Sequence, residues 1–435
     1  MTTDKSNNRS PFSWVPTLYM AEGFPYFAVA IIAGFMFKSL GVPNDEIAYW
    51  TGAIGFAWVF KPLWSPFLEV IRSKKYLAIG FQVLGGLFLG LVALSLQLPN
   101  YFAICIALLG MVAIASATHD IAADGLYILS LNSKQQAAFA GWQGAFYNVA
   151  RFASLSGLLV LAGHLEKTMP PAQAWGIVFG LLAVIMFSLA AYHFWSLPNT
   201  KSTQPTEKLS NIFETSKEVI VDFFKKPGIW MMILFILLFR AGEGQIQTIG
   251  PLFLKELREN GGLGLSTSDL GVVYGFAGST AFIAGSILGG YFASWLGLRK
   301  ALPWLIIAMN FPNIVFFFLS STLPTDLTVI AIALSFEMFG YGFGFVGLIL
   351  FMMQVVAVGN FTTAHYALAT GVMQLGLVIP KMISGKIQMA IGYHTFFIWV
   401  LISALPVLFL CRFMKIKDKD SDTTQPAPET KGLEV

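Results

Sequence analysis

The sequence predicts an all-α membrane protein with twelve transmembrane helices, arranged as two similar six-helix bundles. Three observations support this fold class. Of the 435 residues, 56% are hydrophobic and only 11% are charged, whereas about a quarter are charged in soluble domains. The apolar runs are continuous and about 20 residues long, which is the length that crosses a bilayer as a helix and excludes the alternating pattern of a barrel. The runs also fall into two halves that resemble each other.

The twelve predicted spans follow one another with short polar connections. They lie at residues 14–40, 46–68, 76–98, 101–131, 136–163, 172–195, 227–254, 268–297, 301–321, 327–358, 363–391 and 393–412. The chain is accordingly divided into a cytoplasmic N-terminal segment (1–13), a first six-helix bundle (14–196), a cytoplasmic linker (197–226), a second six-helix bundle (227–412) and a disordered cytoplasmic tail (413–435). The tail is charged and contains proline, a composition typical of disorder.

The linker carries an amphipathic pattern. Leu209, Phe213, Ile220, Phe223 and Phe224 fall near one helical face, with Lys and Glu residues opposite. This spacing favours a helix that lies on the inner leaflet over a featureless polar connection.

Basic residues predict that both ends of the chain lie in the cytoplasm. Eighteen Lys and Arg residues fall on the predicted inner side, against four on the outer side, namely Lys38, Lys167, Lys255 and Arg258. Such an excess on one side sets the orientation of polytopic proteins. The first residues lack the apolar core of a signal peptide, so we expect the first span to direct insertion.

The two halves show weak internal symmetry. Residues 21–23 (AEG) in the first span match residues 242–244 (GEG) in the seventh, and Gly52 matches Gly275. Basic loops follow both the second and the eighth span. Symmetry of this kind is typical of transporters built from repeats, which bind their cargo between the halves near the middle of the membrane.

Ten ionisable residues lie inside the predicted spans. A charge in hydrocarbon costs several kcal/mol unless it is paired or faces water, so these residues mark a pathway or a binding site. They are Glu22, Lys61, Asp120, Asp124, Arg151, Arg240, Glu243, Glu337, Lys381 and Lys386. Five acids and five bases predict a transporter with a charge-balanced polar route. No nucleotide-binding motif occurs, so we expect a proton gradient as the energy source, with no cofactor.

Three motifs in the first half carry a resemblance to a known family. Residues 60–66 (FKPLWSP) close the second span, residues 118–124 (THDIAAD) lie in the fourth, and residues 23–25 (GFP) lie in the first. The architecture resembles the major facilitator superfamily, and these motifs resemble its branch of AmpG-type muropeptide permeases and acetyl-coenzyme A transporters. The resemblance implies the fold over nearly the whole chain, and a cargo of cell-wall fragments.

The sequence departs from this pattern at several positions. Glu69 stands where the resemblance predicts Asp, and Glu22 where it predicts a small uncharged residue. Asn148 follows Tyr147 where Arg would be expected, and Arg151 lies three residues further on. The resemblance therefore predicts the mode of transport more firmly than it predicts the exact cargo.

Asp120 and Asp124 lie four residues apart and so share one face of the fourth span. We expect Lys61 and the basic loop to bond to them, which predicts an inner gate. The gate residues expected are Lys61, Asp120, Asp124, Glu69, Arg72 and Lys74. A proton-coupling role for one of the two aspartates is the alternative. His119 with these aspartates is a weak metal signal, and we expect no metal site.

Proton coupling is expected from Glu22 and Glu337, ahead of Glu243. Glu22 precedes a Gly-Phe-Pro break, and Glu337 has no neighbour in sequence with which to pair. Glu243 lies three residues after Arg240, so this pair either neutralises itself or opens so that Arg240 binds a carboxylate or sulfate of the cargo.

Arg151 and Lys381 provide one cation from each half, which would suit an anionic cargo. The alternative is that span acids such as Asp124 or Glu337 neutralise them. Lys386 is expected to reach the outer interface instead. Aromatic and amide residues complete the expected substrate-binding set, together with Arg240: Tyr26, Trp50, Trp142, Gln143, Tyr147, Asn148, Gln245, Gln247, Gln354 and Gln374.

The function predicted is proton-coupled import of an acidic amphiphilic glycan fragment by a monomer in a bacterial inner membrane. The resemblance implies N-acetylglucosamine linked to anhydro-N-acetylmuramic acid, with or without peptide. Uronate-containing or sulfated disaccharides from nutrient glycans are the first alternative, and a siderophore or peptide the next. A membrane acyltransferase using His119 with Asp120, or a sensor that does not transport, would belong to another class. We expect no catalytic residue and no nucleic-acid partner.

Overall fold

The computed structural model describes residues 9–69, 73–131, 133–199, 209–359, 361–414 and 416. Within this part of the chain, ten helices are long and apolar enough to cross a membrane. The last of them, Ala364–Cys411, contains two helices that meet at Gly392, where φ is 73°. The second span, predicted at residues 46–68, falls in two shorter helices, Asn44–Ile54 and Phe56–Glu69, which lie on either side of Gly55 and are not among the ten.

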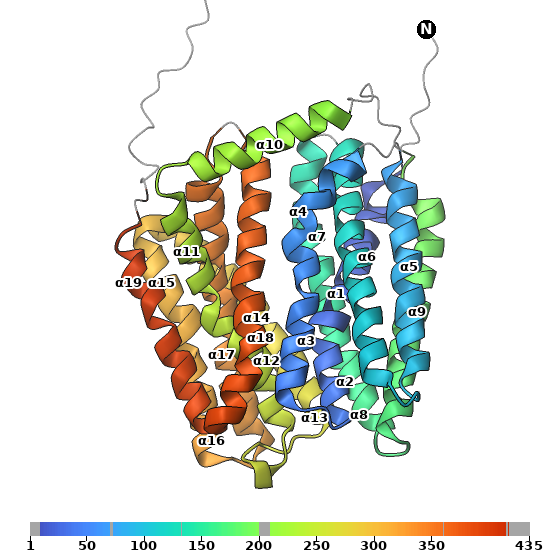
Figure 1. The fold of residues 1–435 in the computed structure, drawn as a ribbon, viewed down its shortest axis with the longest axis vertical. Helices are drawn as coiled ribbons and strands as arrows, with labels where there is room; N and C mark the ends of the chain where they lie inside the picture. The colour runs from blue at the N-terminus through green and yellow to red at the C-terminus, as the bar shows by residue number, and fades with distance from the viewer. Residues whose placement is uncertain are drawn as a thin grey trace, which may run out of the picture.

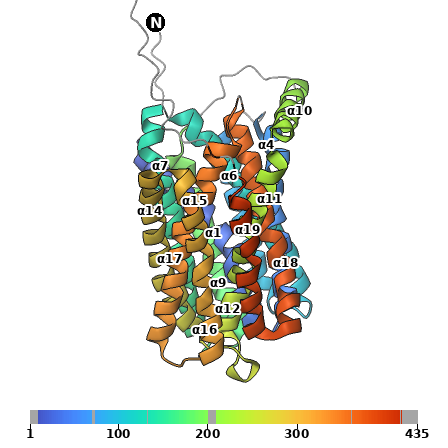
Figure 2. The same ribbon diagram turned by 90° about the vertical axis from the view of Figure 1, so that its left-hand side faces the viewer.

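The helices form two halves that stand side by side (Figure 1). The first half contains α1 (Val15–Phe27), α2 (Ala33–Ser39), α3 (Asn44–Ile54), α4 (Phe56–Glu69), α5 (Lys74–Ser95), α6 (Tyr101–Ser130), α7 (Ser133–Phe152), α8 (Leu159–Leu165) and α9 (Pro171–Ser196). The second half contains α11 (Ile229–Phe239), α12 (Ala241–Lys255), α13 (Thr267–Leu270), α14 (Ser279–Leu296), α15 (Leu298–Asn310), α16 (Ile314–Thr322), α17 (Leu327–Phe351), α18 (Thr362–Ser403) and α19 (Leu405–Cys411). In Figure 2 the second half faces the viewer.

Helix α10 (Leu209–Lys225) lies across one end of the molecule (Figures 1 and 2). Phe223 of α10 is buried, whereas Ile220 and Phe224 remain exposed. His365 of α18 lies 3.6 Å from Asp222 of α10. The side chains of Leu209 and Phe213, also part of the predicted amphipathic face, lie outside the described residues. We call this end the α10 end.

The halves are joined at the end opposite α10 and separate at the α10 end. One apolar cluster includes Phe35 of α2 and Phe253 of α12, so it runs through both halves. Near the α10 end the apolar cores are separate. One is built on Trp14 and Leu126 of the first half, and another on Phe235 and Phe351 of the second.

Backbone contacts close the end opposite α10. A Cβ atom on Gly275 would lie 2.2 Å from the backbone oxygen of Leu155, and one on Gly385 would lie 2.5 Å from Cα of Asp45. Only glycine permits such close approach between helices of different halves. The molecule is therefore open toward α10 and closed at the other end.

In the described part of the chain, four π-helical segments interrupt the spans: Ala28–Ile32, Ala153–Leu158, Gly271–Gly278 and Met352–Val356. A π-helical turn leaves backbone groups without their usual partner and often marks a functional position. The second and third of these segments, one from each half, contact each other where the halves meet.

Candidate functional site

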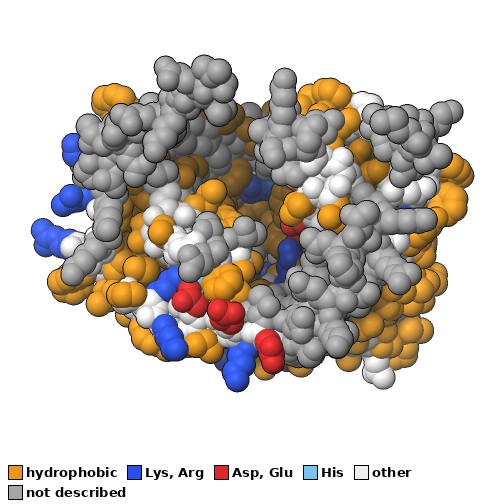
Figure 3. Space-filling model, turned by 90° about the horizontal axis from the view of Figure 1, so that it is seen from above, with side chains coloured by type: hydrophobic (Ala, Val, Ile, Leu, Met, Phe, Trp, Pro, Cys, Tyr) orange, Lys and Arg blue, Asp and Glu red, His pale blue; other side chains and the backbone are white. Residues whose placement is uncertain are grey.

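Charged side chains gather inside the hollow between the two halves. Seen from the α10 end, the surface is hollowed between the halves, and Lys or Arg and Asp or Glu side chains lie within the hollow (Figure 3). The side chains of Lys61 and Asp120 are 26% and 17% exposed, and Asp124 is exposed. These charges therefore have access to water from the α10 end.

Three carboxylates from the first half form a cluster in this region. Oxygen atoms of Glu22 (α1), Asp120 and Asp124 (both α6) lie within 4.8 Å of one another. Lys61 of α4 forms an ion pair with Asp120. The spacing of the oxygens would suit a cation, and the ammonium group of Lys61 supplies one. One carboxylate oxygen of Glu22 is buried without a hydrogen-bond partner in the described structure.

Asp124 accepts a hydrogen bond from a tyrosine hydroxyl of α1. The hydroxyl of Tyr19 donates to Asp124 Oδ1 at 3.0 Å, and Nε2 of Gln143 donates to the Tyr19 hydroxyl at 2.6 Å. Gln143, expected to bind substrate, thus belongs with the carboxylate cluster. His119 faces away from this cluster: its Nε2 lies 2.8 Å from Gln82, which in turn contacts His193.

In the second half, Arg240 and Glu243 form a buried bidentate pair. Nε and Nη2 of Arg240 donate to the two carboxylate oxygens at 2.7 and 2.6 Å, and both residues are at most 5% exposed. Gln247 bonds to Glu243 and also to the Tyr341 hydroxyl at 3.0 Å. In this conformation the charge of Arg240 is neutralised within its own half, because charge-assisted fork contacts use both donors.

Arg151 and Glu337 are buried opposite charges contributed by different halves. Their exposed fractions are 9% and 4%. Among the described residues, Arg151 has no carboxylate within 4.0 Å, and its Nε and one Glu337 oxygen are buried without a hydrogen-bond partner. Arg151 instead lies over the ring of Phe282 at 4.3 Å, and its Nη2 is 3.9 Å from sulfur of Met338, the residue after Glu337.

Lys381 connects the halves through a backbone carbonyl. Its Nζ donates at 3.0 Å to the oxygen of Ala30, which lies in the first π-helical segment. A small cavity beside Lys381 is lined from both halves, by residues that include Thr51 and Gln247. No carboxylate in the described chain lies within ion-pair distance of Lys381, so its charge remains available for an anion.

Three aromatic residues of the first half form a cluster that an amide of the second half approaches. The ring of Tyr26 lies 5.0 Å from that of Trp58 and 6.1 Å from that of Tyr147. Gln374 of the second half approaches the Tyr26 hydroxyl. These rings combine contributions from α1, α4 and α7 with an amide from α18.

Other expected site residues lie elsewhere. Trp142 packs on Phe12, Trp50 bonds to Glu46, and Asn148 donates to the Gly144 carbonyl of its own helix. Gln245 bonds to Trp399 and Ser403 inside the second half, and Gln354 is exposed. Lys74 donates to the backbone oxygen of Leu68. Arg72 and the side chain of Glu69 lie outside the described residues.

Tyr19, Trp58 and Tyr341 were not predicted as site residues. Each lies three or four positions from a charged residue predicted for the site, namely Glu22, Lys61 and Glu337. Residues at that spacing share a helical face, so this rule would have found all three.

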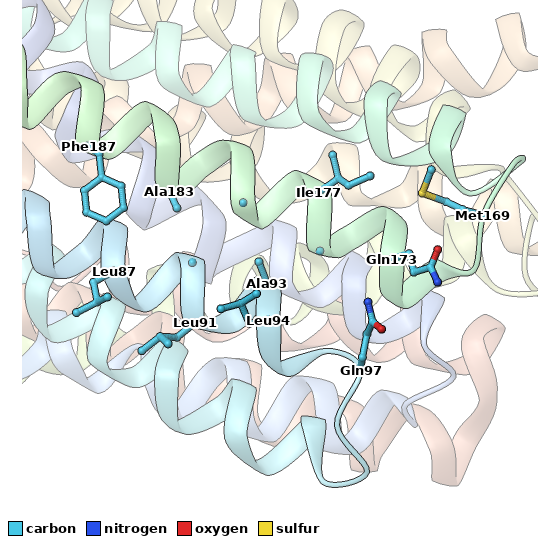
Figure 4. Close-up of a pocket in the computed structure, with 13 residues that line it drawn as sticks. Leu87, Leu91, Ala93, Leu94, Gln97, Met169, Gln173, Ile177, Ala183 and Phe187 are labelled. Atoms are coloured by element: carbon cyan, nitrogen blue, oxygen red, sulfur yellow. The ribbon is translucent and has the colours of Figure 1, made fainter.

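A separate groove of about 700 Å³ lies between α5 and α9 on the outside of the first half (Figure 4). Its lining includes Leu87, Leu91 and Phe187, with Gln97 and Gln173 near one end. It contains none of the charged residues described above, and its apolar lining suits contact with lipid.

Comparison with known proteins identifies the family. A model of the Major Facilitator Superfamily matches residues 17–385. The chain belongs to the major facilitator superfamily. This is a family of transporters rather than enzymes, and the resemblance predicted from the sequence motifs is confirmed.

Among the superfamily members, the anhydromuropeptide permease of Escherichia coli (strain K12) is 24% identical over 410 residues, which cover 91% of this chain and 78% of the permease. A crystal structure of a D-xylose-proton symporter aligns with a TM-score of 0.70 at 10% identity, covering 93% of this chain and 98% of that one. A crystal structure of the nucleoside transporter NupG aligns with a TM-score of 0.68 at 12% identity, covering 92% of this chain and 97% of that one. These two structures support the fold alone.

Proposed function

We propose that this superfamily member is a proton-coupled symporter that imports an acidic amphiphilic glycan fragment across a bacterial inner membrane. The fragment proposed is N-acetylglucosamine linked to anhydro-N-acetylmuramic acid, with or without peptide. The E. coli relative, an anhydromuropeptide permease, supports this cargo class. In the same proposal the chain has twelve spans, and both ends and α10 lie in the cytoplasm, so the structure is inward-open.

The observation that carries the proposal is the set of charges left without ion-pair partners where the halves meet. Arg151 and Lys381, one from each half, have no carboxylate within 4.0 Å in the described structure, whereas Lys61 and Arg240 do. An anion held between Arg151 and Lys381 would contact both halves at once. Contacts of this kind couple the binding of cargo to the relative movement of the halves.

The acidic residues of the spans also divide into those with an ion-pair partner and those without one. Glu243 and Asp120 are paired, whereas Glu22 and Glu337 each keep a buried oxygen without a partner in the described structure. Burial without a compensating bond disfavours the charged carboxylate, which is the property that a proton carrier requires. The aromatic rings of Tyr26, Trp58 and Tyr147 would stack against sugar rings.

A thermal-shift screen of the purified protein tests the cargo. The ligands are the N-acetylglucosaminyl-anhydromuramyl unit, muropeptides, uronate disaccharides, sulfated disaccharides, neutral disaccharides and a siderophore, because a ligand stabilises the state that it binds. Stabilisation by the anhydromuramyl ligands supports the proposal. Stabilisation by uronate or sulfated disaccharides alone would replace the cargo with a nutrient glycan. Stabilisation by neutral disaccharides alone would contradict an anionic cargo.

Arg151→Gln is expected to weaken cargo binding. A hydrogen bond to a charged group contributes about 1.5–3 kcal/mol, so the dissociation constant should rise roughly 10- to 150-fold. Calorimetric titration of the anhydromuramyl ligand measures the change. Lys386→Gln is the matched control, because Lys386 is an exposed span cation. Equal affinities for wild-type protein and Arg151→Gln would remove Arg151 from the site.

A further inference from the structure

The guanidinium group of Arg151 lies over an aromatic ring that belongs to the other half. Arg151 is in the last turn of α7, and its Cζ atom is 4.3 Å from the centroid of the Phe282 ring of α14. Arg151 is only 9% exposed, and it has no ion-pair partner among the described residues. A buried charge is costly without compensation. The electron-rich face of the Phe282 ring supplies part of that compensation.

This contact leaves the hydrogen-bond donors of Arg151 free. A guanidinium group meets a ring through its flat face, whereas its N–H bonds point outward in its own plane. Nε of Arg151 is buried without a partner in the described structure, and Nη2 meets only the sulfur of Met338 at 3.9 Å, a weak acceptor. Arg240 differs, because Nε and Nη2 both donate to Glu243, and the Phe345 ring lies farther away, at 5.2 Å.

The Phe282 ring is itself held in a fixed position. A Cβ atom on Gly342 of α17 would lie 2.2 Å from the backbone oxygen of Phe282, so the two backbones are in close contact. The Ser286 hydroxyl donates to the same oxygen at 2.9 Å. The centroid of the Phe282 ring lies 4.9 Å from that of Tyr341, whose hydroxyl accepts from Gln247 at 3.0 Å. Helices α14 and α17 together therefore give Arg151 a rigid surface on which to rest.

We propose that Phe282 is a positioning residue that holds the guanidinium group of Arg151 ready for a carboxylate of the cargo, and so sets the preference for acidic over neutral cargo. This inference rests on the proposed function, in which Arg151 binds the anion. An arginine side chain that is free to rotate loses conformational entropy when it binds a ligand. A side chain already restricted by a ring loses less, so its affinity for the anion is higher.

An aromatic partner serves this purpose better than an acidic one. A carboxylate beside Arg151 would neutralise its charge and occupy its donors, as Glu243 does for Arg240, and an acidic cargo would have to displace it. The Phe282 ring occupies no donor. An acidic cargo therefore gains charge-assisted hydrogen bonds, which are roughly twice as strong as those of a neutral group. A neutral cargo of the same shape gains only the weaker bonds.

Calorimetric titration of the purified full-length protein tests this role. The probes are N-acetylglucosaminyl-anhydromuramic acid and the same disaccharide with its carboxyl group converted to the methylamide. The quantity measured is the ratio of the two dissociation constants. Both ligands are titrated into the same preparation, so a smaller folded fraction changes the number of sites rather than this ratio. A uronate disaccharide and its methylamide form a second pair of probes.

The variants are Phe282→Leu, Phe282→Tyr and the matched control Phe276→Leu. Phe276 also belongs to the second half, and its ring centroid lies 5.6 Å from that of Phe152 in the first half. The control thus removes a ring contact between the halves, beside Arg151 in sequence, and leaves the Phe282 ring under the guanidinium group in place.

The wild-type protein is expected to bind the acid more tightly than the methylamide. Phe282→Leu should raise the dissociation constant of the acid roughly 2- to 10-fold, which corresponds to the cost of ordering one long side chain, and should affect the methylamide much less. Phe282→Tyr retains a ring and should restore the wild-type ratio, and Phe276→Leu should not change it. In an Arg151→Gln background, Phe282→Leu should have no further effect on the ratio, because the ring acts through Arg151.

A wild-type ratio in Phe282→Leu would overturn the inference, and so would an equal loss of the ratio in Phe276→Leu. An effect of Phe282→Leu that persists in the Arg151→Gln background would also overturn it, because the ring would then act by another route. Failure of the proposed function gives a different result. A wild-type protein that prefers the acid in neither pair of probes would contradict the anionic cargo itself, and with it the role given to Phe282, before any variant is measured.

Discussion

Replacing Glu337 by glutamine is expected to abolish the pH-driven accumulation of cargo while leaving the exchange of cargo across the membrane intact. Glu337 is 4% exposed, and one of its oxygens has no hydrogen-bond partner in the described structure. Glutamine matches the shape of a protonated carboxyl group but cannot release a proton. The variant should therefore still exchange cargo, because its side chain stays neutral throughout exchange. It should fail the step of net transport in which the carboxyl group releases its proton.

Two assays with labelled cargo in proteoliposomes measure this effect. One applies an inward proton gradient and follows net accumulation, and the other follows exchange between equal concentrations of cargo. Glu259→Gln is the control, since that acid is exposed in the short connection that follows α12. Accumulation by Glu337→Gln at the wild-type level would exclude Glu337 as the proton carrier and leave Glu22 as the candidate.

Glu243→Gln is expected to destabilise the protein more than any other single exchange of a span acid. It removes the charged partner of Arg240, which is 4% exposed and uses two donors on that carboxylate. Breaking a buried ion pair from one side costs roughly 3–5 kcal/mol, because it leaves an unpaired buried charge. The midpoint of thermal unfolding in detergent micelles should fall clearly.

The double variant Arg240→Met with Glu243→Leu tests whether the unpaired charge causes the loss of stability. Replacing both members of a buried pair by apolar residues is often neutral for stability, so the unfolding midpoint should recover. A double variant as unstable as Glu243→Gln would mean that the pair contributes through its surroundings, Gln247 and Tyr341, rather than through charge compensation.

Pairing within one half could be predicted from the sequence, and pairing between the two halves could not. Arg240 and Glu243 lie three residues apart. The contact between Lys61 and Asp120 of the fourth span was expected because these two residues lie at a similar depth in their predicted spans. Lys38 and Glu256 form an ion pair although they are 218 positions apart, and their meeting depends on how the two halves pack. No periodicity in either half encodes that packing.

The same distinction applies to the amides and aromatic rings. Tyr26 and Tyr147 were expected in the site, and their rings meet there with that of Trp58. Gln245 was expected beside them, but it points into its own half, because adjacent residues on a helix face different directions. The sequence placed Gln245 at the right depth, and only the rotation of α12 decides which side chain faces the cavity. Membrane depth is therefore readable from hydropathy, and rotation requires the packed structure.

Proton movement in sealed proteoliposomes tests the central claim most directly. Adding the N-acetylglucosaminyl-anhydromuramyl ligand outside, with a pH-sensitive dye trapped inside and no other gradient, should acidify the interior in wild-type vesicles. The signal should be absent from empty vesicles and from Glu337→Gln. Uptake of labelled ligand without any acidification would contradict proton coupling, and acidification with neutral disaccharides but not with the anhydromuramyl ligand would contradict the anionic cargo.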